Sequence, residues 1–561
     1  MVRFGAIAGL LLGSVSVASA IQRHPLPISE LAKQIRGSDA HNGLSTRATG
    51  LQALYPEYNL STPIDHFHND SLYEPHSNGS FNLRYWYDAQ FYKPGGPVIV
   101  LASGETSGTD RLPFLQKGIV YQLAKATGGV GVILEHRYYG SSIPVEDFST
   151  ANLRFLTTDQ ALADTAYFAK NVKFEGLEDV DLSPESTPWF AYGGSYAGSF
   201  VAFLRKLYPD VYFGAISSSG VPEAIWDYWK YFEAAAVYGP PDCVETTRKL
   251  TNVVDNILIG KKGSDSVAQL KEAFGLPNVT YDNDFATAIN SGIYALQSLN
   301  WDPAQSSNAF FLYCGNVSSN SVLYPGTEER RASVEDLITT GGYEEELDTL
   351  ANRMLNYIGY VNLTSVSSCA KTQDECFTTH DTAFYSNDDI SQTWRLWQYQ
   401  VCTQWGYLQT GSGVPEDQLP LISRTIDLNY SAIACRDAFN LTAPADVDAI
   451  NKYGGYNISY PRLAFVDGEW DPWRAAGVHA LGLPERTSTP SEPYLLIDNA
   501  VHHWDENGLF PNETTPELPP PAVAQTQQQI AEFVQGWVQE FNKTTSKSKL
   551  DRTTTTTTGK C

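Results

Sequence analysis

A serine among small residues lies where an apolar segment gives way to a helical one. Residues 188–198 read PWFAYGGSYAG, with Ser195 near the middle. Small neighbours let a strand and the following helix approach closely, so that the serine oxygen is exposed at the end of the strand. A serine held in this way becomes a nucleophile for acyl transfer when a base takes its proton. Ala197 stands where glycine is commoner in such turns, and alanine is small enough to preserve the turn.

An acid for such a nucleophile is found in the run FVDGEWDPW at residues 465–473. Asp471 lies just past the carboxyl end of an expected strand, in a loop that Pro472 and Trp473 would make rigid. Asp467 and Glu469 compete for the role, and they are otherwise interpreted as a turn residue and a solvated charge. The position in the loop favours Asp471.

The base is expected directly after the last apolar segment, where residues 496–505 read LIDNAVHHWD. His502 is the preferred residue, and its neighbour His503 would point elsewhere. His479 lies in a stretch that looks helical and is a weaker alternative. The serine, the acid and the histidine follow one another in this order along the chain, each at the end of a strand. This order is typical of the catalytic triad in one class of folds built from alternating strands and helices.

An oxyanion hole requires two backbone N–H groups near the nucleophile. Tyr196 follows Ser195 directly and is expected to supply one of them. The second is expected from the loop after the apolar segment 98–102, where either Gly104 or Glu105 is suitably placed.

Short apolar segments alternate with helical ones on both sides of these residues. Segments 98–102, 130–134, 189–192, 213–217, 462–466 and 494–497 are predicted to be buried parallel strands, and segments 159–172 and 195–207 to be helices. The alternation predicts an α/β fold with a doubly wound, mostly parallel sheet. A helix bearing Ile530, Phe533, Val534, Trp537, Val538 and Phe541 on one face should pack on this sheet.

The chain changes character in its middle, which sets the expected domain limits. Residues 51–223 and 456–541 are predicted to be the two parts of the sheet domain, and residues 224–455 to be an inserted, mainly helical cap domain, with helices at 244–259 and 343–357. The tail 542–561 is rich in Lys, Ser and Thr, cannot build a core, and is predicted to be disordered.

The amino terminus predicts export from the cell. Arg3 precedes an apolar run that ends in a small-residue site at 18–20, which is typical of a signal peptide over residues 1–20. A membrane anchor is the alternative, but the apolar run is short and rich in Gly and Ser. Residues 21–50 are interpreted as either a pro-segment or an irregular arm. A secreted location follows, with a vacuolar or lysosomal-type compartment as an alternative.

Cysteines and glycosylation acceptors fit an oxidising, exported environment. Six cysteines are expected to form three disulfides, and closeness in sequence favours only Cys369 with Cys376; the six are Cys243, Cys314, Cys369, Cys376, Cys402 and Cys435, while Cys561 ends the chain. Eleven Asn-x-Ser/Thr acceptors accompany them: Asn59, Asn69, Asn78, Asn278, Asn316, Asn362, Asn429, Asn440, Asn457, Asn512 and Asn542.

The charge of the chain limits its partners. A formal net charge of −25 argues against nucleic acid or an anionic membrane as a partner, because both attract positive charge. An acidic surface also suits work at low pH, where carboxylates are partly neutralised. No cofactor and no metal are predicted, and a homodimer is left open.

With these residues in place, the chain resembles the family of prolyl carboxypeptidase, dipeptidyl peptidase II and the fungal acid prolyl endopeptidases. The resemblance runs from residue 64 to residue 537 and rests on the following runs: IDHF at 64–67, FNLRYW at 81–86, PGGP at 94–97, GE at 104–105, EHRYYG at 135–140, LTTDQ at 156–160, GGSYAG at 193–198, DPW at 471–473 and VHH at 501–503. It departs from the family at Ser103 and Asp467, where glycine and asparagine are usual.

The resemblance implies an α/β-hydrolase fold with a helical, disulfide-bearing cap, the triad Ser195, Asp471 and His502, and cleavage of peptides after proline. A pocket for the rigid proline ring should be an aromatic slot, and Trp473 is a candidate wall unless it only packs the loop into the core. Glu105 would bind a substrate amine or brace the oxyanion loop. Residues 224–231, with Trp226 and Trp229, are further candidates for the cleft.

Three alternatives remain at this point. An esterase or lipase shares the serine turn and the triad order, but the EHRYYG run does not favour it. Serine carboxypeptidases of the yeast carboxypeptidase Y type have a similar stretch but usually carry Glu at the position of Gly194. An adhesion protein of the same fold would lack a triad member.

Overall fold

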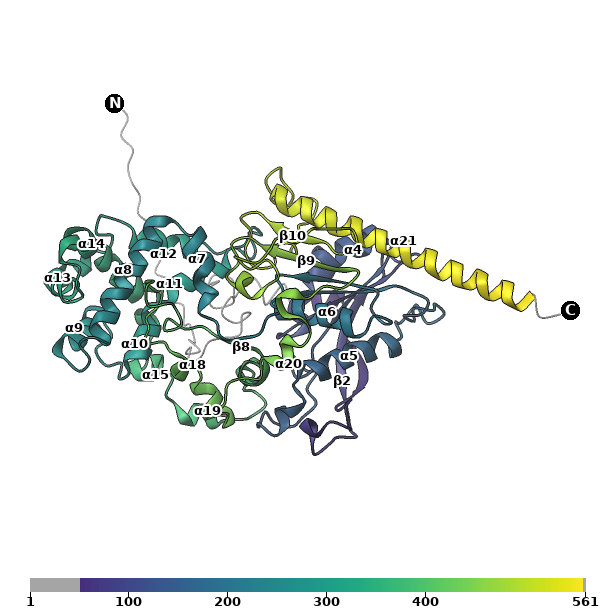
Figure 1. Ribbon diagram of the computed structural model, residues 1–561, viewed down its shortest axis with the longest axis horizontal. Helices are drawn as coiled ribbons and strands as arrows, with labels where there is room; N and C mark the ends of the chain where they lie inside the picture. Colours follow the sequence, from purple (N-terminus) through teal and green to yellow (C-terminus); the bar gives the residue numbers. More distant parts are fainter. Residues whose placement is uncertain (1–50, 558–561) are drawn as a thin grey trace, which may run out of the picture.

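The computed structural model describes residues 51–557 (Figure 1). The predicted signal peptide at 1–20, the segment 21–50 and Cys561 lie outside the described residues. Within residues 51–557 no helix is both long enough and apolar enough to cross a membrane.

The core is an eight-stranded sheet in the order β1-β2-β4-β3-β5-β6-β9-β10. The strands are β1 (Tyr58–Pro63), β2 (Ser80–Asp88), β3 (Val98–Ala102), β4 (Val130–Leu134), β5 (Trp189–Gly194), β6 (Gly214–Ser218), β9 (Leu463–Gly468) and β10 (Tyr494–Ile497). From β4 to β10 all neighbouring strands are parallel, whereas β1 and β2 join in antiparallel register. This is the α/β-hydrolase fold, as predicted.

Two strands of this eight-stranded sheet are absent from the sequence-based prediction. Strands β1 and β2 pair antiparallel at the edge of the sheet, and one face of each is partly exposed. Their residues therefore alternate in polarity, whereas a strand buried on both faces is predicted from an apolar run.

Helices cover both faces of the sheet because alternate strand residues point to opposite sides. On one face Ile99 and Leu101 share a core with α4 (Ile119–Thr127) and α21 (Pro521–Thr557). On the other face Val98 and Val100 pack with α5 (Thr158–Asn171) and α6 (Tyr196–Leu207). Burial on both faces explains why β3 reads as an uninterrupted apolar run.

Between β6 and β9 the chain forms a largely helical segment that extends to one side of the sheet (Figure 1). Its helices are α7 (Glu233–Tyr238), α8 (Pro241–Leu258), α9 (Asp265–Ala273), α10 (Asp282–Ile289), α11 (Ser291–Tyr294), α12 (Ala309–Val317), α13 (Arg331–Thr340), α14 (Leu347–Thr364), α15 (Gln373–Phe377), α16 (Thr382–Ser386), α17 (Trp394–Gln400), α18 (Leu428–Ser431), α19 (Ile433–Phe439) and α20 (Asp448–Asn451). Two short strands of this segment, β7 (Ile225–Asp227) and β8 (Gly406–Leu408), form a separate parallel pair. Helix α8 matches the predicted helix at 244–259, and α14 begins and ends later than the predicted 343–357.

Three disulfides lie within this helical segment. They join Cys243 to Cys314, Cys369 to Cys376, and Cys402 to Cys435. The first links α8 to α12 and the last links α19 to the turn after α17, so that segments far apart in sequence are tied together. Such bonds stabilise the folded state mainly by restricting the unfolded chain.

We expect alkylation of the denatured, unreduced protein to label none of these six cysteines. Each sulfur is already bonded, so that only Cys561 can react if the tail is retained. The measurement is mass spectrometry of tryptic peptides with and without prior reduction. Reduction serves as the control and should expose six further thiols; labelling of any of the six without reduction would contradict the three pairs.

Helix α21 runs to Thr557, well into the segment 542–561 that the sequence predicts to be disordered. Its first half is anchored by the buried side chains of Ile530, Val534 and Trp537. A helix that is already nucleated by packing extends at little cost per residue, even where Thr is frequent. The sequence-based prediction considered only the lack of apolar anchors in the tail.

Candidate functional site

Ser195 occupies the sharp turn between β5 and α6. Its backbone has φ 61° and ψ −124°, which is outside the regions that side chains ordinarily allow. The N–H of Ser195 donates to the carbonyl of Ser218 on β6 at 2.9 Å, and its carbonyl accepts from Gly198 at 2.9 Å. The turn is therefore held from both sides, as strained backbone at a functional position must be.

Glycines beside the turn are required by space. A Cβ at Gly193 would lie 2.1 Å from the carbonyl oxygen of Ala197, and one at Gly198 would lie 2.9 Å from that of Ser218. A larger residue at Gly193 would push α6 away from β5, and one at Gly198 would push α6 away from β6. These contacts explain the run of small residues that singled out Ser195 in the sequence.

Asp471 and His502 lie together, as the sequence predicts. The Oδ2 of Asp471 and the Nδ1 of His502 are 2.7 Å apart, and both side chains are buried. The other oxygen of Asp471 accepts from the N–H of Trp473 at 2.9 Å. The carboxylate is thus fixed by the turn that follows it, and it orients the imidazole.

One side-chain atom of Ser195 and one of His502 have no hydrogen-bond partner among the described residues. The Oγ of Ser195 and the Nε2 of His502 are both buried and unpaired. In substrate-free sites the bond between nucleophile and base is often long and tightens only when substrate binds. Neither atom is committed to another described side chain.

The competing residues are occupied elsewhere. Asp467 pairs with Nδ1 of His479 at 2.6 Å, and Glu469 accepts from the N–H of Asn499 at 3.0 Å. His479 follows the short turn Pro472–Ala476 and lies in a loop, so its expected helical position is wrong. His503 donates its N–H to Ser219 and faces Glu506, with 3.3 Å between Nδ1 and the carboxylate.

Three buried acids, Glu105, Asp505 and Glu506, lie near the adjacent histidines His502 and His503. The sequence analysis named only Glu105. Burial raises the pKa of Glu105, which the positive field of Arg111 opposes. Burial lowers the pKa of His503 to about 4, helped by the neighbouring charge of His502. Burial alone would raise the pKa of Glu506, but the hydrogen bond and the charge of His503 outweigh burial and lower this pKa. The two acids could have been found from the sequence, because the run DE at 505–506 follows the two histidines after a single tryptophan.

Asp505 links strands β5 and β6 through its carboxyl group. Its carboxyl accepts from the hydroxyls of Ser218 at 2.5 Å and Tyr192 at 2.8 Å. Ser218 in turn receives the N–H of Ser195 through its carbonyl. Burial raises the pKa of Asp505 to about 7. The carboxyl is therefore protonated in the folded protein at acid pH, while the unfolded chain ionises near pH 4.

We expect Asp505→Asn to reduce the dependence of stability on pH. Between about pH 4 and pH 7 the folded protein retains a proton that the unfolded chain has lost, so stability falls as pH rises through this range. The loss is on the order of a few kcal/mol. Urea unfolding at pH 4.5 and pH 7 measures it for both proteins. A variant whose midpoint shifts with pH as much as the wild type would exclude Asp505 as the source.

The expected oxyanion residues adjoin the turn. Gly104 has φ 69°, and a Cβ on it would lie 3.3 Å from the Cβ of Ala197, so the loop after β3 touches the start of α6. Tyr196 begins α6, and its hydroxyl lies 2.9 Å from Nε2 of buried His136. That contact belongs to the EHRYYG run and fixes the helix start. The role of the backbone N–H groups of Tyr196 and Gly104 remains a prediction.

Trp473 belongs to an aromatic cluster beside His502. Its ring lies 5.3 Å from Tyr228, 5.4 Å from Tyr231 and 5.3 Å from Tyr407, centroid to centroid, and 6.5 Å from the imidazole of His502. The tyrosines at 228 and 231, not the tryptophans of the same segment, make these contacts. Trp473 both packs its loop and places apolar surface next to His502.

The fold is that of the α/β-hydrolases, and the three predicted site residues Ser195, Asp471 and His502 follow strands β5, β9 and β10 of its sheet. The chain matches the family described as serine carboxypeptidase S28 over residues 62–518, and it belongs to that family. It is a serine-type peptidase.

Similar proteins carry related descriptions. A probable extracellular serine carboxypeptidase of Arthroderma benhamiae is 51% identical over 91% of this chain and 72% of its own length. The serine protease vicPa of Bipolaris victoriae is 29% identical over 76% of this chain and 81% of its own. The thymus-specific serine protease of Mus musculus is 26% identical over 87% and 88%. The esterase, lipase and adhesion alternatives are set aside by the family.

Proposed function

We propose that this peptidase cleaves peptide bonds on the carboxyl side of proline, using Ser195, Asp471 and His502 through an acyl-enzyme. The observation that carries the proposal is the buried 2.7 Å contact between His502 and Asp471, together with the strained Ser195 whose Oγ is left unpaired. These are the residues and the roles that such a triad requires.

In this mechanism His502 takes the proton of Ser195 as its oxygen attacks the peptide carbonyl. Asp471 holds the imidazole and stabilises its charged form. The backbone N–H groups of Tyr196 and of Gly104 or Glu105 donate hydrogen bonds to the developing oxyanion. His502 then protonates the departing amine, and water releases the acyl group by the reverse path. The buried side chain of Glu105, which belongs to the loop after β3, braces that loop.

Proline specificity rests on the aromatic cluster around Trp473. A slot of tyrosine and tryptophan rings suits the rigid, apolar pyrrolidine ring, which loses little entropy on binding. Gln297 supports the slot because its Oε1 accepts from Nε1 of Trp473 at 2.9 Å and from the hydroxyl of Tyr231 at 2.8 Å.

We expect peptides with proline before the scissile bond to be preferred over matched alanine peptides by on the order of a hundredfold in kcat/KM. Alanine leaves two carbons of the slot unfilled, at roughly 1–1.5 kcal/mol each. The measurement is kcat/KM on the two peptides across pH 3–8, with products of a long peptide identified by mass spectrometry. Equal rates would remove the proline proposal, and a profile confined to alkaline pH would remove the proposal of acid activity.

Export to an oxidising exterior is part of the proposal. The predicted signal peptide, the three disulfides and the extracellular description of the Arthroderma relative support it. Of the eleven glycosylation acceptors, nine are exposed, whereas Asn316 and Asn362 are half-buried. The side-chain amide of Asn362 donates to two carbonyls, so we propose that this acceptor is the poorest substrate for glycosylation.

A further inference from the structure

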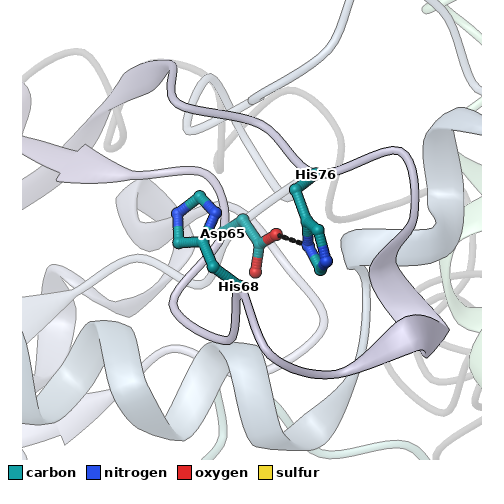
Figure 2. A group of neighbouring side chains, drawn as sticks. All are labelled: Asp65, His68 and His76. Atoms are coloured by element: carbon teal, nitrogen blue, oxygen red, sulfur yellow. Dashed lines mark hydrogen bonds and ion pairs between the residues drawn. The ribbon is translucent and has the colours of Figure 1, made fainter.

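Two histidines and an aspartate meet in the connection between β1 and β2. Figure 2 shows the carboxyl of Asp65 between the imidazoles of His68 and His76. One ligand atom from each of the three residues lies within 4.8 Å of the other two. The Oδ2 of Asp65 and the Nδ1 of His76 are already 2.7 Å apart. None of these residues takes part in the proposed catalysis.

The carboxyl of Asp65 is oriented as a metal ligand would be. Its Oδ1 accepts from the N–H of Phe67 at 2.8 Å and from the side chain of Gln160 at 2.8 Å. Outer hydrogen bonds of this kind fix ligands in metal sites. They leave Oδ2 directed at His76. Asp65 is buried, whereas His68 is exposed and His76 is partly exposed, so an ion has access from solvent.

The neighbouring histidine provides a contrast. His66 directs its Nε2 to Asp164 at 2.8 Å, and Asp164 also binds the buried guanidinium of Arg137. His66 is therefore committed to a structural ion-pair network. His68 and His76 make no such ion pair with Asp164 in the described structure, and their rings face one another at a centroid distance of 5.5 Å.

We propose that Asp65, His68 and His76 bind one Zn²⁺ ion, with water in the fourth position. Two imidazole nitrogens and a carboxylate oxygen are a ligand set that suits zinc among the common divalent ions, whereas calcium and magnesium prefer oxygen. Tetrahedral zinc needs its ligands closer together than 4.8 Å, and exposed His68 can move inward to supply the change.

The ion would join two points of the β1–β2 connection, Asp65 and His76, that are eleven positions apart. The same connection packs on the sheet domain through Arg154, whose guanidinium donates to the carbonyls of Tyr73 and Pro75. Zinc bound here therefore stabilises the folded protein and leaves catalysis untouched.

The test is zinc titration of the untagged full-length protein after removal of metals with EDTA, at pH 7.5. We expect isothermal calorimetry to show one Zn²⁺ per chain, and Co²⁺ to give the visible absorption of a tetrahedral site. His68→Ala and His76→Ala should each weaken zinc binding at least about tenfold. Zinc should also raise the Tm of the wild type more than that of either variant.

Glu74→Gln is the matched control, because Glu74 is an exposed acid of the same connection that is outside the cluster. It should bind zinc as the wild type does. Each variant is first checked for peptidase activity and circular dichroism; His68 is exposed, so His68→Ala should fold even if His76→Ala does not. Zinc binding that survives His68→Ala in a folded protein, or no binding by the wild type at 100-fold excess of Zn²⁺, would overturn the proposal.

Discussion

Replacing Ser195 with alanine should lower kcat by roughly 10⁴- to 10⁶-fold while the protein is still secreted and folded. The variant loses the only atom that forms the acyl-enzyme, and the residual rate comes from binding and the oxyanion hole. Alanine retains the Cβ that Ser195 carries at φ 61°, so the backbone strain of the turn is unchanged. The measurement is kcat on a proline-containing peptide, with fluorophosphonate labelling as a second readout.

Ser217→Ala is the matched control for this experiment. Ser217 is also a buried serine at the carboxyl end of a neighbouring strand, and its hydroxyl has no hydrogen-bond partner among the described residues. Its removal should leave labelling and turnover close to those of the wild type. If Ser195→Ala kept a tenth of the normal rate, the nucleophile would have to be another residue.

His502→Ala should be about as damaging as loss of the serine, because nucleophile and base act as one unit. His503→Ala should cost no more than about tenfold, although the two rings lie 4.1 Å apart. Only His502 pairs with Asp471, whereas His503 faces Glu506. The pair of variants thus compares two adjacent histidines in one site by their kcat on the same peptide.

Removal of His503 leaves the buried carboxylate of Glu506 without its histidine, and this should lower stability. Activity is therefore compared well below the Tm of each variant. A larger loss in His503→Ala than in His502→Ala, with both proteins folded, would move the base by one residue.

The sequence could predict what is encoded locally. Ser195 was found because its turn needs small residues within a few positions, and β3 because a strand buried on both faces is an apolar run. Asp471 and His502 followed from their positions at strand ends. The structure brings these two side chains together although they are 31 positions apart.

The sequence could not predict contacts between residues that lie far apart along the chain. The pairing of Asp467 with His479, which removes both from competition, requires the path of the loop between them. Two of the three disulfides join cysteines that are 33 and 71 positions apart, and spacing alone does not select them. The sequence alone gives no sign that Asp505 is buried. Its burial depends on Tyr192 and Ser218, whose hydroxyls donate hydrogen bonds to its carboxyl.

The insertion between β6 and β9 also governs when the enzyme can first act. These strands are neighbours, with Ala215 opposite Leu463, yet the ribosome makes some 250 residues between them. Closing so long a connection costs entropy that is recovered only when β9 docks. Ser195 is synthesised before this segment and both of its proposed partners after it. With the proposed triad, the growing chain has no complete active site until His502 has been synthesised. A product truncated within the insertion lacks Asp471 and His502 and therefore cannot cleave other proteins in the secretory pathway.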